Sequence, residues 1–385
     1  MLNYEFPPMG GGAGSATYNI AKELVKMGHS VDVLTSKIEN QKAKEVLDGI
    51  NVFRVFSWRN SIHDCGLKGA YSYLFFAALK IRKLCKKNRY DVLHYFFSLP
   101  TGLLSLLPGI HRKIPYIVSL RGSDVPYYDT YSRKVHVFHM ILKPVNKYIW
   151  KRAKKIVALS WGLKLTAQRT APELHMEVIP NGVETDIFKP IDQEKYNSKN
   201  LNLITVSRLI NRKGINHILE ALSKLNDKKI TLMVVGIGNY EKNLKDLCKK
   251  LMLNDVVTFH GYHPREKLSE LYNKADVFIL PSLAESFGLV FAEAMACRLP
   301  IIGGRTGGVP DLVKEENGIL VEPGNIKEIQ NAILEMRDNI GKRLLMGEAN
   351  RKRVLNHYSW KYVAKRYFDI YQDTLNIDTM LHSSK

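Results

Sequence analysis

The stretch from Asp276 to Gly304 restricts the possible folds more than any other part of the chain. It contains an apolar run at 276–282, a loop with Glu285, a short apolar helix with Glu293, and a second apolar run at 300–304. A strand, a helix and a second strand in this order form a βαβ unit, whose ligands bind beyond the carboxyl ends of the strands. The two glutamates therefore mark the ligand side of a parallel sheet.

The same alternation of apolar runs and amphipathic helices continues almost to the end of the chain, which predicts the α/β class with parallel sheets. We expect strands at 2–4, 30–35, 52–56, 91–96, 115–120, 155–160, 176–180, 201–207, 230–235, 256–260, 276–282, 300–304 and 318–321. We expect helices at 15–27, 70–87, 133–154, 215–225, 241–253, 265–274 and 325–337.

The polar segment 184–202, which contains Pro190, reads as a linker between two lobes. We therefore predict an N-terminal domain at 1–184 and a C-terminal domain at 185–358. The segment 359–385 is predicted to form a helix from Trp360, with one apolar face that crosses back onto the first domain, and a frayed tail after Asn376.

The first predicted strand is unusually short. Only the residues up to Tyr4 precede the first loop, whereas parallel strands usually have about five or six residues. We expect the first strand to be truncated, or the true start to lie upstream.

The charge of the chain is strongly positive and unevenly distributed. The 385 residues carry a formal charge of +20, with 28 Lys and Arg against 14 Asp and Glu in residues 1–190. The excess clusters at 80–89 and 133–155. A basic face attracts nucleic acid, anionic lipid headgroups or phosphorylated substrates, although a merely solvated basic surface is an equal alternative for either cluster.

Cysteine usage favours a reducing compartment. The four cysteines are scattered without a C-x-x-C pair, which fits reduced thiols better than a disulfide framework or a zinc site. The first residues lack the basic and apolar regions of a signal peptide. We predict a cytoplasmic protein, peripheral at the inner face of a membrane.

Two loops have the composition of phosphate-binding segments. Gly11 and Gly12 lie between the first strand and the first helix, where backbone N–H groups can face an anion. Ser15 breaks the G-x-G-x-x-G pattern, which disfavours a dinucleotide cofactor, and a permissive tight turn is the alternative. In the second lobe, Arg208 and Lys213 follow a strand and can neutralise a diphosphate, although a solvated loop remains the alternative.

The loop and helix of the opening stretch complete the candidate site. Phe287, Gly288 and Leu289 open a helix, so their N–H groups are unpaired and can face a phosphate. Glu285 and Glu293 can accept hydrogen bonds from hydroxyls at the two ends of a nucleotide sugar. A local salt bridge of Glu293 is the alternative.

These motifs together resemble the family 4 glycosyltransferases, which are retaining, use nucleotide sugars and have the GT-B fold. The resemblance covers nearly the whole chain and rests on F-P-P-M-G-G-G-A, M-G-H-S-V-D-V-L-T (27–35), S-L-R-G-S-D (119–124), P-N-G-V (180–183), S-R-L-I-N-R-K-G and E-S-F-G-L-V-F-A-E-A-M-A. It implies two Rossmann-like domains facing a central cleft, with the C-terminal helix crossing back to the first domain.

The resemblance also implies a role for each candidate residue. Arg208 and Lys213 would bind the donor diphosphate, Glu285 the donor sugar and Glu293 the ribose. The N–H groups of Gly11, Gly12 and Phe287–Leu289 would assist at the phosphates. Many members of the family carry a histidine where this chain has Arg121, so Arg121 and Asp124 become the candidates for binding donor phosphate or positioning the acceptor.

The resemblance implies transfer of a sugar from a nucleoside diphosphate to an acceptor hydroxyl with retention, usually assigned to front-face attack. The expected acceptor is a glycan or a lipid-linked molecule of the cell envelope, beside an anionic membrane surface. No cofactor or metal is expected, because the chain lacks a D-x-D motif. The alternatives are a GT-B enzyme of epimerase type and, least favoured, a basic nucleic-acid-binding protein. We expect no nucleic-acid partner.

Overall fold

The computed structural model describes the chain apart from residues 10, 39, 60–64, 111–113, 129–132, 192–199 and 384–385. The chain forms two compact units. Unit 1 contains Met1–Asn181 together with Trp360–Lys385, and unit 2 contains Gly182–Ser359.

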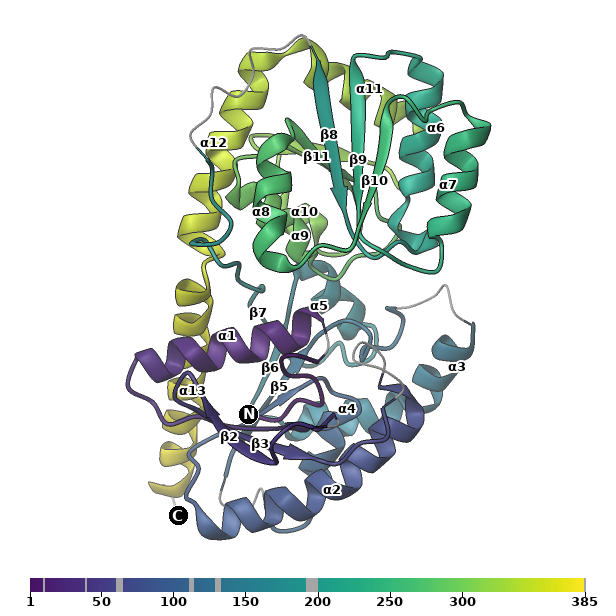
Figure 1. The fold of residues 1–385 in the computed structure, drawn as a ribbon. Coiled ribbons are helices and arrows are strands. Elements are labelled where there is room, and N and C mark those ends of the chain that lie inside the picture. Colours follow the sequence, from purple (N-terminus) through teal and green to yellow (C-terminus); the bar gives the residue numbers. More distant parts are fainter. Residues whose placement is uncertain are drawn as a thin grey trace. The chain divides into compact units, whose positions relative to one another are not determined.

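Unit 2 is built on a fully parallel six-stranded sheet (Figure 1). Its strands are β8 (Leu201–Val206), β9 (Ile230–Val235), β10 (Val257–Gly261), β11 (Val277–Leu280), β12 (Ile301–Gly304) and β13 (Gly318–Val321). They lie in the order β10-β9-β8-β11-β12-β13. The chain order reverses between β8 and β11, and ligands of open α/β sheets bind at such a switch point.

The apolar periodicity predicted for the helix at 215–225 matches the face that this helix buries in the structure. In α6 (Ile215–Leu225), Ile215, Ile218, Leu219 and Leu222 point into the core formed with the sheet. The others are α7 (Glu241–Lys250), α8 (Arg265–Lys274), α9 (Leu289–Ala296), α10 (Val309–Leu312), α11 (Ile326–Asp338) and α12 (Ile340–His357). The sequence did not predict α12.

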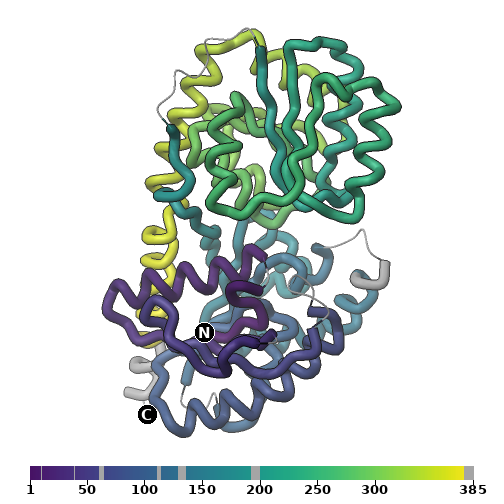
Figure 2. The backbone as a smooth tube through the Cα atoms, viewed as in Figure 1, coloured from purple at the N-terminus to yellow at the C-terminus, as the bar shows by residue number. Residues whose placement is uncertain are grey.

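Unit 1 contains two sets of strands joined by the first residues of the chain. One set has β1 (Asp32–Ser36), β2 (Lys44–Leu47) and β3 (Ile50–Val55), and the other has β4 (Leu93–Phe96), β5 (Tyr116–Leu120), β6 (Lys155–Ala158) and β7 (Glu177–Val178). Leu2 bridges to Leu34 of β1 and to Tyr95 of β4. Its N–H donates to the His94 carbonyl at 2.8 Å, so the first residues join the two sets of strands. Figure 2 marks the N-terminus within this unit.

The helices of unit 1 lie on both faces of this sheet (Figure 1). They are α1 (Gly12–Lys26), α2 (Gly66–Lys87), the 3-10 helix η1 (Thr101–Leu106), α3 (Arg133–Ile141), α4 (Lys143–Arg152), α5 (Trp161–Gln168) and α13 (Trp360–Ser383). The single helix predicted at 133–154 is wrong, because the chain breaks between α3 and α4. Pro144 lies in the first turn of α4, where its missing N–H needs no partner.

The last helix belongs to unit 1. Trp360, Val363, Tyr367 and Ile370 of α13 pack in one core with α1 and the sheet. His94 joins α13 through a hydrogen bond to the Tyr371 hydroxyl at 2.8 Å. The helix continues to Ser383, and fraying of the chain after Asn376 stays a prediction. Adding a residue to an existing helix gains a backbone hydrogen bond without a new nucleation cost. The α/β class and the returning C-terminal helix are confirmed.

Candidate active site

Two loops meet at the switch point of unit 2. The loop after β8 contains Arg208 and Lys213, and the loop after β11 leads through Glu285 to α9. The N–H of Leu283 donates to the Arg212 carbonyl at 2.8 Å. Gly214 has a φ of +70°, and a Cβ there would lie 2.4 Å from the Pro281 carbonyl oxygen. This contact requires glycine, and it holds the two loops together.

The predicted cation and the predicted sugar-binding acid form an ion pair. Lys213 Nζ lies 2.5 Å from Glu285 Oε2, and the two side chains are only 12% and 11% exposed. A charge-assisted contact in such a sheltered place is stronger than a surface ion pair. Arg208 is exposed just beyond β8, and its side chain has no hydrogen bond or ion pair with any residue the structure describes.

A third loop fixes the backbone of Glu285. The N–H of Gly308 donates to the Glu285 carbonyl at 3.0 Å. Gly307 has a φ of +53°, and a Cβ there would lie 1.6 Å from the same oxygen. The Thr306 hydroxyl donates to the Leu283 carbonyl at 3.3 Å. The loop after β12 therefore holds Glu285 in position, a role that the sequence interpretation did not assign to these residues.

The start of α9 presents backbone donors beside this ion pair. Gly288 precedes the helix with a φ of +81°, and its added Cβ would lie 2.5 Å from the Phe291 ring. Within the described part of the chain, the N–H groups of Phe287, Gly288 and Leu289 have no hydrogen-bond acceptor. The positive end of the helix dipole adds to the charge of the neighbouring cationic loop.

Glu293 is held in a separate, buried network. It is 4% exposed, and its two oxygens contact Arg265 at 2.9 Å and the Tyr272 hydroxyl at 3.1 Å. Arg265 also lies 2.6 Å from Glu184. Burial raises the pKa of Glu293, and the attraction of Arg265 opposes this only in part. Arg265, Tyr272 and Glu184 were not predicted, because no sequence spacing links them to Glu293.

In unit 1, the predicted glycine turn lies at the start of α1. Gly11 precedes the helix and Gly12 begins it. The N–H of Gly11 points at Glu5 Oε2, at 3.4 Å. A carboxylate at this place is stabilised by the helix dipole, as a phosphate would be. At this helix start, the place predicted for a phosphate therefore has an acidic side chain beside it.

Arg121 and Asp124 lie at the end of β5 and are both buried. Asp124 accepts backbone hydrogen bonds from Ser98 at 2.6 Å, Arg121 at 2.8 Å and Gly122 at 3.0 Å. The Arg121 guanidinium donates to Asn181 at 2.8 Å and lies 5.3 Å from the centre of the Phe96 ring. Burial lowers the pKa of Arg121 and raises that of Asp124. Asp124 therefore shapes the loop, and Arg121 supplies a sheltered positive charge.

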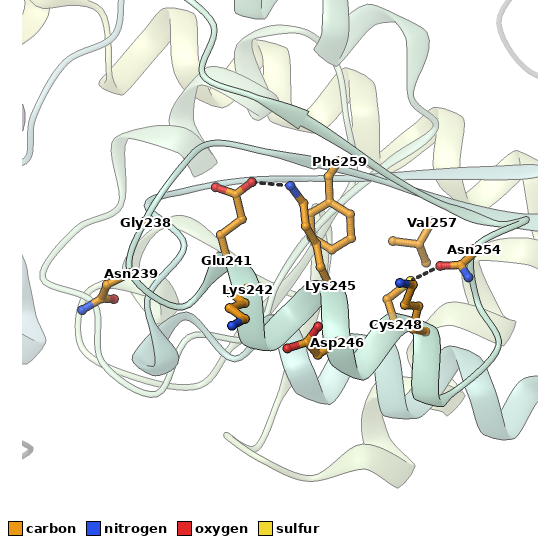
Figure 3. Close-up of a pocket in the computed structure, with 11 residues that line it drawn as sticks. Gly238, Asn239, Glu241, Lys242, Lys245, Asp246, Cys248, Asn254, Val257 and Phe259 are labelled. Atoms are coloured by element: carbon orange, nitrogen blue, oxygen red, sulfur yellow. Dashed lines mark hydrogen bonds and ion pairs between the residues drawn. The ribbon is translucent and has the colours of Figure 1, made fainter.

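An open groove of about 730 Å³ lies along α7 and is not built from the predicted site residues. Its lining includes Lys242, Lys245 and Phe259, and Figure 3 shows Lys245 turned toward Glu241. Their side chains form an ion pair at 2.7 Å. The groove therefore differs from the switch-point site, where loops of three strands converge.

The residues that the structure describes contain no group of three or more His, Cys, Asp or Glu side chains placed to hold a metal ion. The expectation that the reaction needs no metal stays a prediction.

Comparison with protein families assigns the two halves of the chain. Residues 10–187 match the model described as "Glycosyltransferase Family 4", and residues 187–353 match the model described as "Glycosyl transferases group 1". The chain belongs to glycosyltransferase family 4. The resemblance seen in the sequence motifs is confirmed.

Relatives of this glycosyltransferase agree with the assignment over its full length. A GDP-mannose-dependent alpha-(1-6)-phosphatidylinositol monomannoside mannosyltransferase of Mycobacterium tuberculosis is 29% identical, over 96% of each chain. The sucrose-phosphate synthase of Thermosynechococcus elongatus superposes with a TM-score of 0.82 and 23% identity, over 95% of this chain and 94% of the other. HepE of Anabaena, solved in complex with UDP-glucose, gives a TM-score of 0.72 and 19% identity, over 97% and 98%. The glycosyltransferase therefore has the GT-B fold.

Proposed function

We propose that this glycosyltransferase moves a sugar from a nucleoside diphosphate to an acceptor hydroxyl, with retention of the anomeric configuration and without a metal or other cofactor. The observation that carries the proposal is the Lys213–Glu285 pair at the switch point of unit 2. It joins a cation suited to a diphosphate to a carboxylate suited to sugar hydroxyls. The UDP-glucose bound by HepE supports a nucleotide-sugar donor.

The diphosphate would be bound by Arg208, Lys213 and the backbone N–H groups of Phe287–Leu289. Arg208 is exposed and lacks a partner among the described residues, so its charge is available to a ligand. The helix start and the two cations act on the same charge that develops on the leaving diphosphate. This arrangement performs the task that a metal performs in other enzymes.

The transfer would follow front-face attack. The acceptor oxygen bonds to the anomeric carbon on the side from which the diphosphate leaves. The bond between that carbon and the diphosphate oxygen breaks, and its electron pair goes to the diphosphate. The acceptor proton passes to the departing oxygen, so no side chain is needed as a general base. Glu285 would orient the sugar through its hydroxyls.

Glu293 would bind the ribose. Both of its oxygens already have a partner, but a carboxylate can accept about four hydrogen bonds. Arg265 and Tyr272 would thus position Glu293 and leave lone pairs for the hydroxyls. The raised pKa indicates that this burial is unfavourable for the ionised form, which fits a residue retained for binding.

In unit 1, we propose that Gly11 and Gly12 offer backbone N–H groups to a phosphate and that Arg121 supplies positive charge, in a loop shaped by Asp124. The acceptor would be a glycan or a lipid-linked molecule of envelope synthesis, as the name of the mycobacterial relative suggests. The positive charge of residues 1–190 supports work at the inner, anionic face of a membrane.

A donor screen tests the proposal. UDP-, GDP- and ADP-sugars are incubated with the protein, and thermal shift and release of free nucleoside diphosphate are measured, with and without EDTA. We expect one donor class to stand out, and Glu285→Ala to reduce release by about 10²–10³-fold. Glu315→Ala removes an exposed acid of the same unit and should match the wild type.

Two results would contradict the proposal. If every donor behaves alike with the wild type and with Glu285→Ala, the site assignment is wrong. If the nucleotide sugar is converted into an isomer without any acceptor, the epimerase alternative is correct. If a glycoside is formed with an acceptor, nuclear magnetic resonance of that product decides between retention and inversion.

A further inference from the structure

We propose that the outer face of α2 is a membrane-docking surface that inserts aromatic and aliphatic side chains into an anionic lipid bilayer. The overall charge of unit 1 does not say which surface would meet a membrane, but the exposure pattern of this helix does. Figure 1 shows α2 as a long helix on the outer side of unit 1.

The first three turns of α2 expose an apolar stripe. Leu67, Tyr71, Phe75 and Leu79 follow one another at intervals of four residues, so they share one side of the helix. They are 65%, 69%, 63% and 54% exposed, respectively. The opposite side is buried through Tyr73, Ala77, Ile81 and Leu84. The helix therefore has an inner apolar face that packs on the unit and an outer apolar stripe that the described residues leave exposed.

Neighbouring aromatic rings widen this stripe. Phe56 and Trp58, which follow β3, are 45% and 66% exposed. Their rings lie 5.4 Å apart, and Phe56 also lies 5.6 Å from Phe76, which in turn contacts Phe75 at 5.2 Å. Isolated exposed hydrophobic residues are common, but contiguous apolar patches usually mark interaction sites. We call these residues, with the helix stripe, the α2 patch.

The charge of the helix identifies the partner. It carries Lys68, Lys80, Arg82, Lys83, Lys86 and Lys87 and no acidic residue. A second copy of this helix would bring only like charge, so the pattern disfavours self-association. An anionic lipid surface offers phosphates to the cations and acyl chains to the aromatic rings, and this combination is typical of interfacial helices. The described part of the chain has no helix long and apolar enough to span a membrane.

Vesicle binding tests the proposal directly. The full chain is sedimented with phosphatidylcholine vesicles that contain or lack phosphatidylglycerol. We expect binding only to the anionic vesicles, with release at high salt. Replacing Tyr71, Phe75 and Leu79 by serine should weaken binding by at least about tenfold, while nucleoside diphosphate release from a soluble donor stays unchanged. The matched control replaces Met252, Tyr262 and Leu345 of unit 2 by serine and should bind the vesicles like the wild type. These side chains are 88%, 68% and 75% exposed.

A matched pair of variants tests the contribution of charge. Replacing Arg82, Lys83 and Lys86 by glutamine should weaken binding to the anionic vesicles at least about tenfold. Replacing three exposed lysines of α7 by glutamine should change it little; these are Lys242, Lys249 and Lys250.

Tryptophan fluorescence shows whether the patch inserts. Trp58 and Trp161 are exposed, whereas Trp150 and Trp360 are buried. In a Trp161→Phe variant, we expect the emission of Trp58 to shift to the blue with anionic vesicles. The proposal is overturned if the wild type does not bind them, or if the serine variant binds them equally well. The proposal is also overturned if the protein binds a single-stranded DNA oligonucleotide and not the vesicles. A third contrary result is a concentration-dependent dimer that the serine variant loses, with no binding to vesicles.

Discussion

Gly307→Ala should inactivate the transferase by moving Glu285. Gly307 has a left-handed φ of +53°, and the new Cβ would lie 1.6 Å from the Glu285 carbonyl oxygen. Real contacts of this kind begin near 3.0 Å, so the backbone of Glu285 must shift by about 1.4 Å. Such a shift breaks the 2.5 Å contact with Lys213, and a misplacement of about 1 Å can cost roughly 100-fold in rate.

Gly261→Ala is the matched control. Gly261 has a φ of +69° in the same unit, but an added Cβ there meets nothing within 4 Å. Both variants carry the backbone cost of a left-handed alanine, roughly 1–2 kcal/mol. For a unit of this size, 1 kcal/mol corresponds to about 2–4 °C in Tm. Only Gly307→Ala should also lose activity.

The assay is release of nucleoside diphosphate from the donor selected by the screen, at a temperature well below the Tm of both variants. We expect Gly261→Ala to retain wild-type rates and Gly307→Ala to lose at least about 100-fold. Equal rates for the two variants would contradict this prediction, because Glu285 would then tolerate displacement.

Three further predictions concern buried polar groups. Glu293→Gln should weaken donor binding at least about tenfold at pH 7 without lowering Tm. The effect of burial on the pKa of Glu293 outweighs the attraction of Arg265, so the ionised form does not stabilise the fold. A large fall in Tm would contradict this. Asp124→Asn should destabilise unit 1 by about 1–3 kcal/mol in urea unfolding, because an amide cannot accept from all three N–H groups; unchanged stability would contradict it. Burial, then the Met1 amine and Arg121, hold the pKa of His94 well below 6.5, so unfolding takes up a proton below that pH. The free energy of unfolding should therefore fall by up to about 1.4 kcal/mol per pH unit as the pH decreases, and it should fall less steeply in His94→Gln. Equal pH slopes for the wild type and the variant would show that His94 is not the cause.

Most strands could be predicted because their apolar runs are buried on both faces. The predicted strands at 115–120 and 276–282 match β5 and β11, in which every residue is buried. The missed strand β2 has the polar sequence K-E-V-L, and β3 is its only partner among the described strands. Lys44 and Val46 are exposed. An edge strand of this kind lacks the burial pattern that identifies a strand in a sequence.

The candidate site could be named from the sequence, but its contacts could not. Lys213 and Glu285 are 72 positions apart, and only the strand order β8-β11 brings their loops together. The role of Gly307 depends on a backbone approach that composition does not reveal. Arg265 is equally hidden, because its contact with Glu293 joins the first residue of α8 to the middle of α9.

Asp124 has a structural role that its place in the sequence did not reveal. Its place after a strand made it a candidate for binding acceptor or phosphate, which remains a proposal for the pair with Arg121. The structure shows both carboxylate oxygens occupied by backbone N–H groups of its own loop and of Ser98. An aspartate a few residues beyond a strand can serve the backbone as readily as a ligand.

We propose above all that a nucleoside diphosphate binds at the switch point of unit 2. Hydrogen–deuterium exchange with and without the nucleoside diphosphate of the selected donor tests it most directly, because it reports each loop separately. We predict protection in 207–214 and 284–296, absent in Lys213→Met. Protection confined to the α7 groove at 238–259, with the switch-point loops unchanged, would contradict the account.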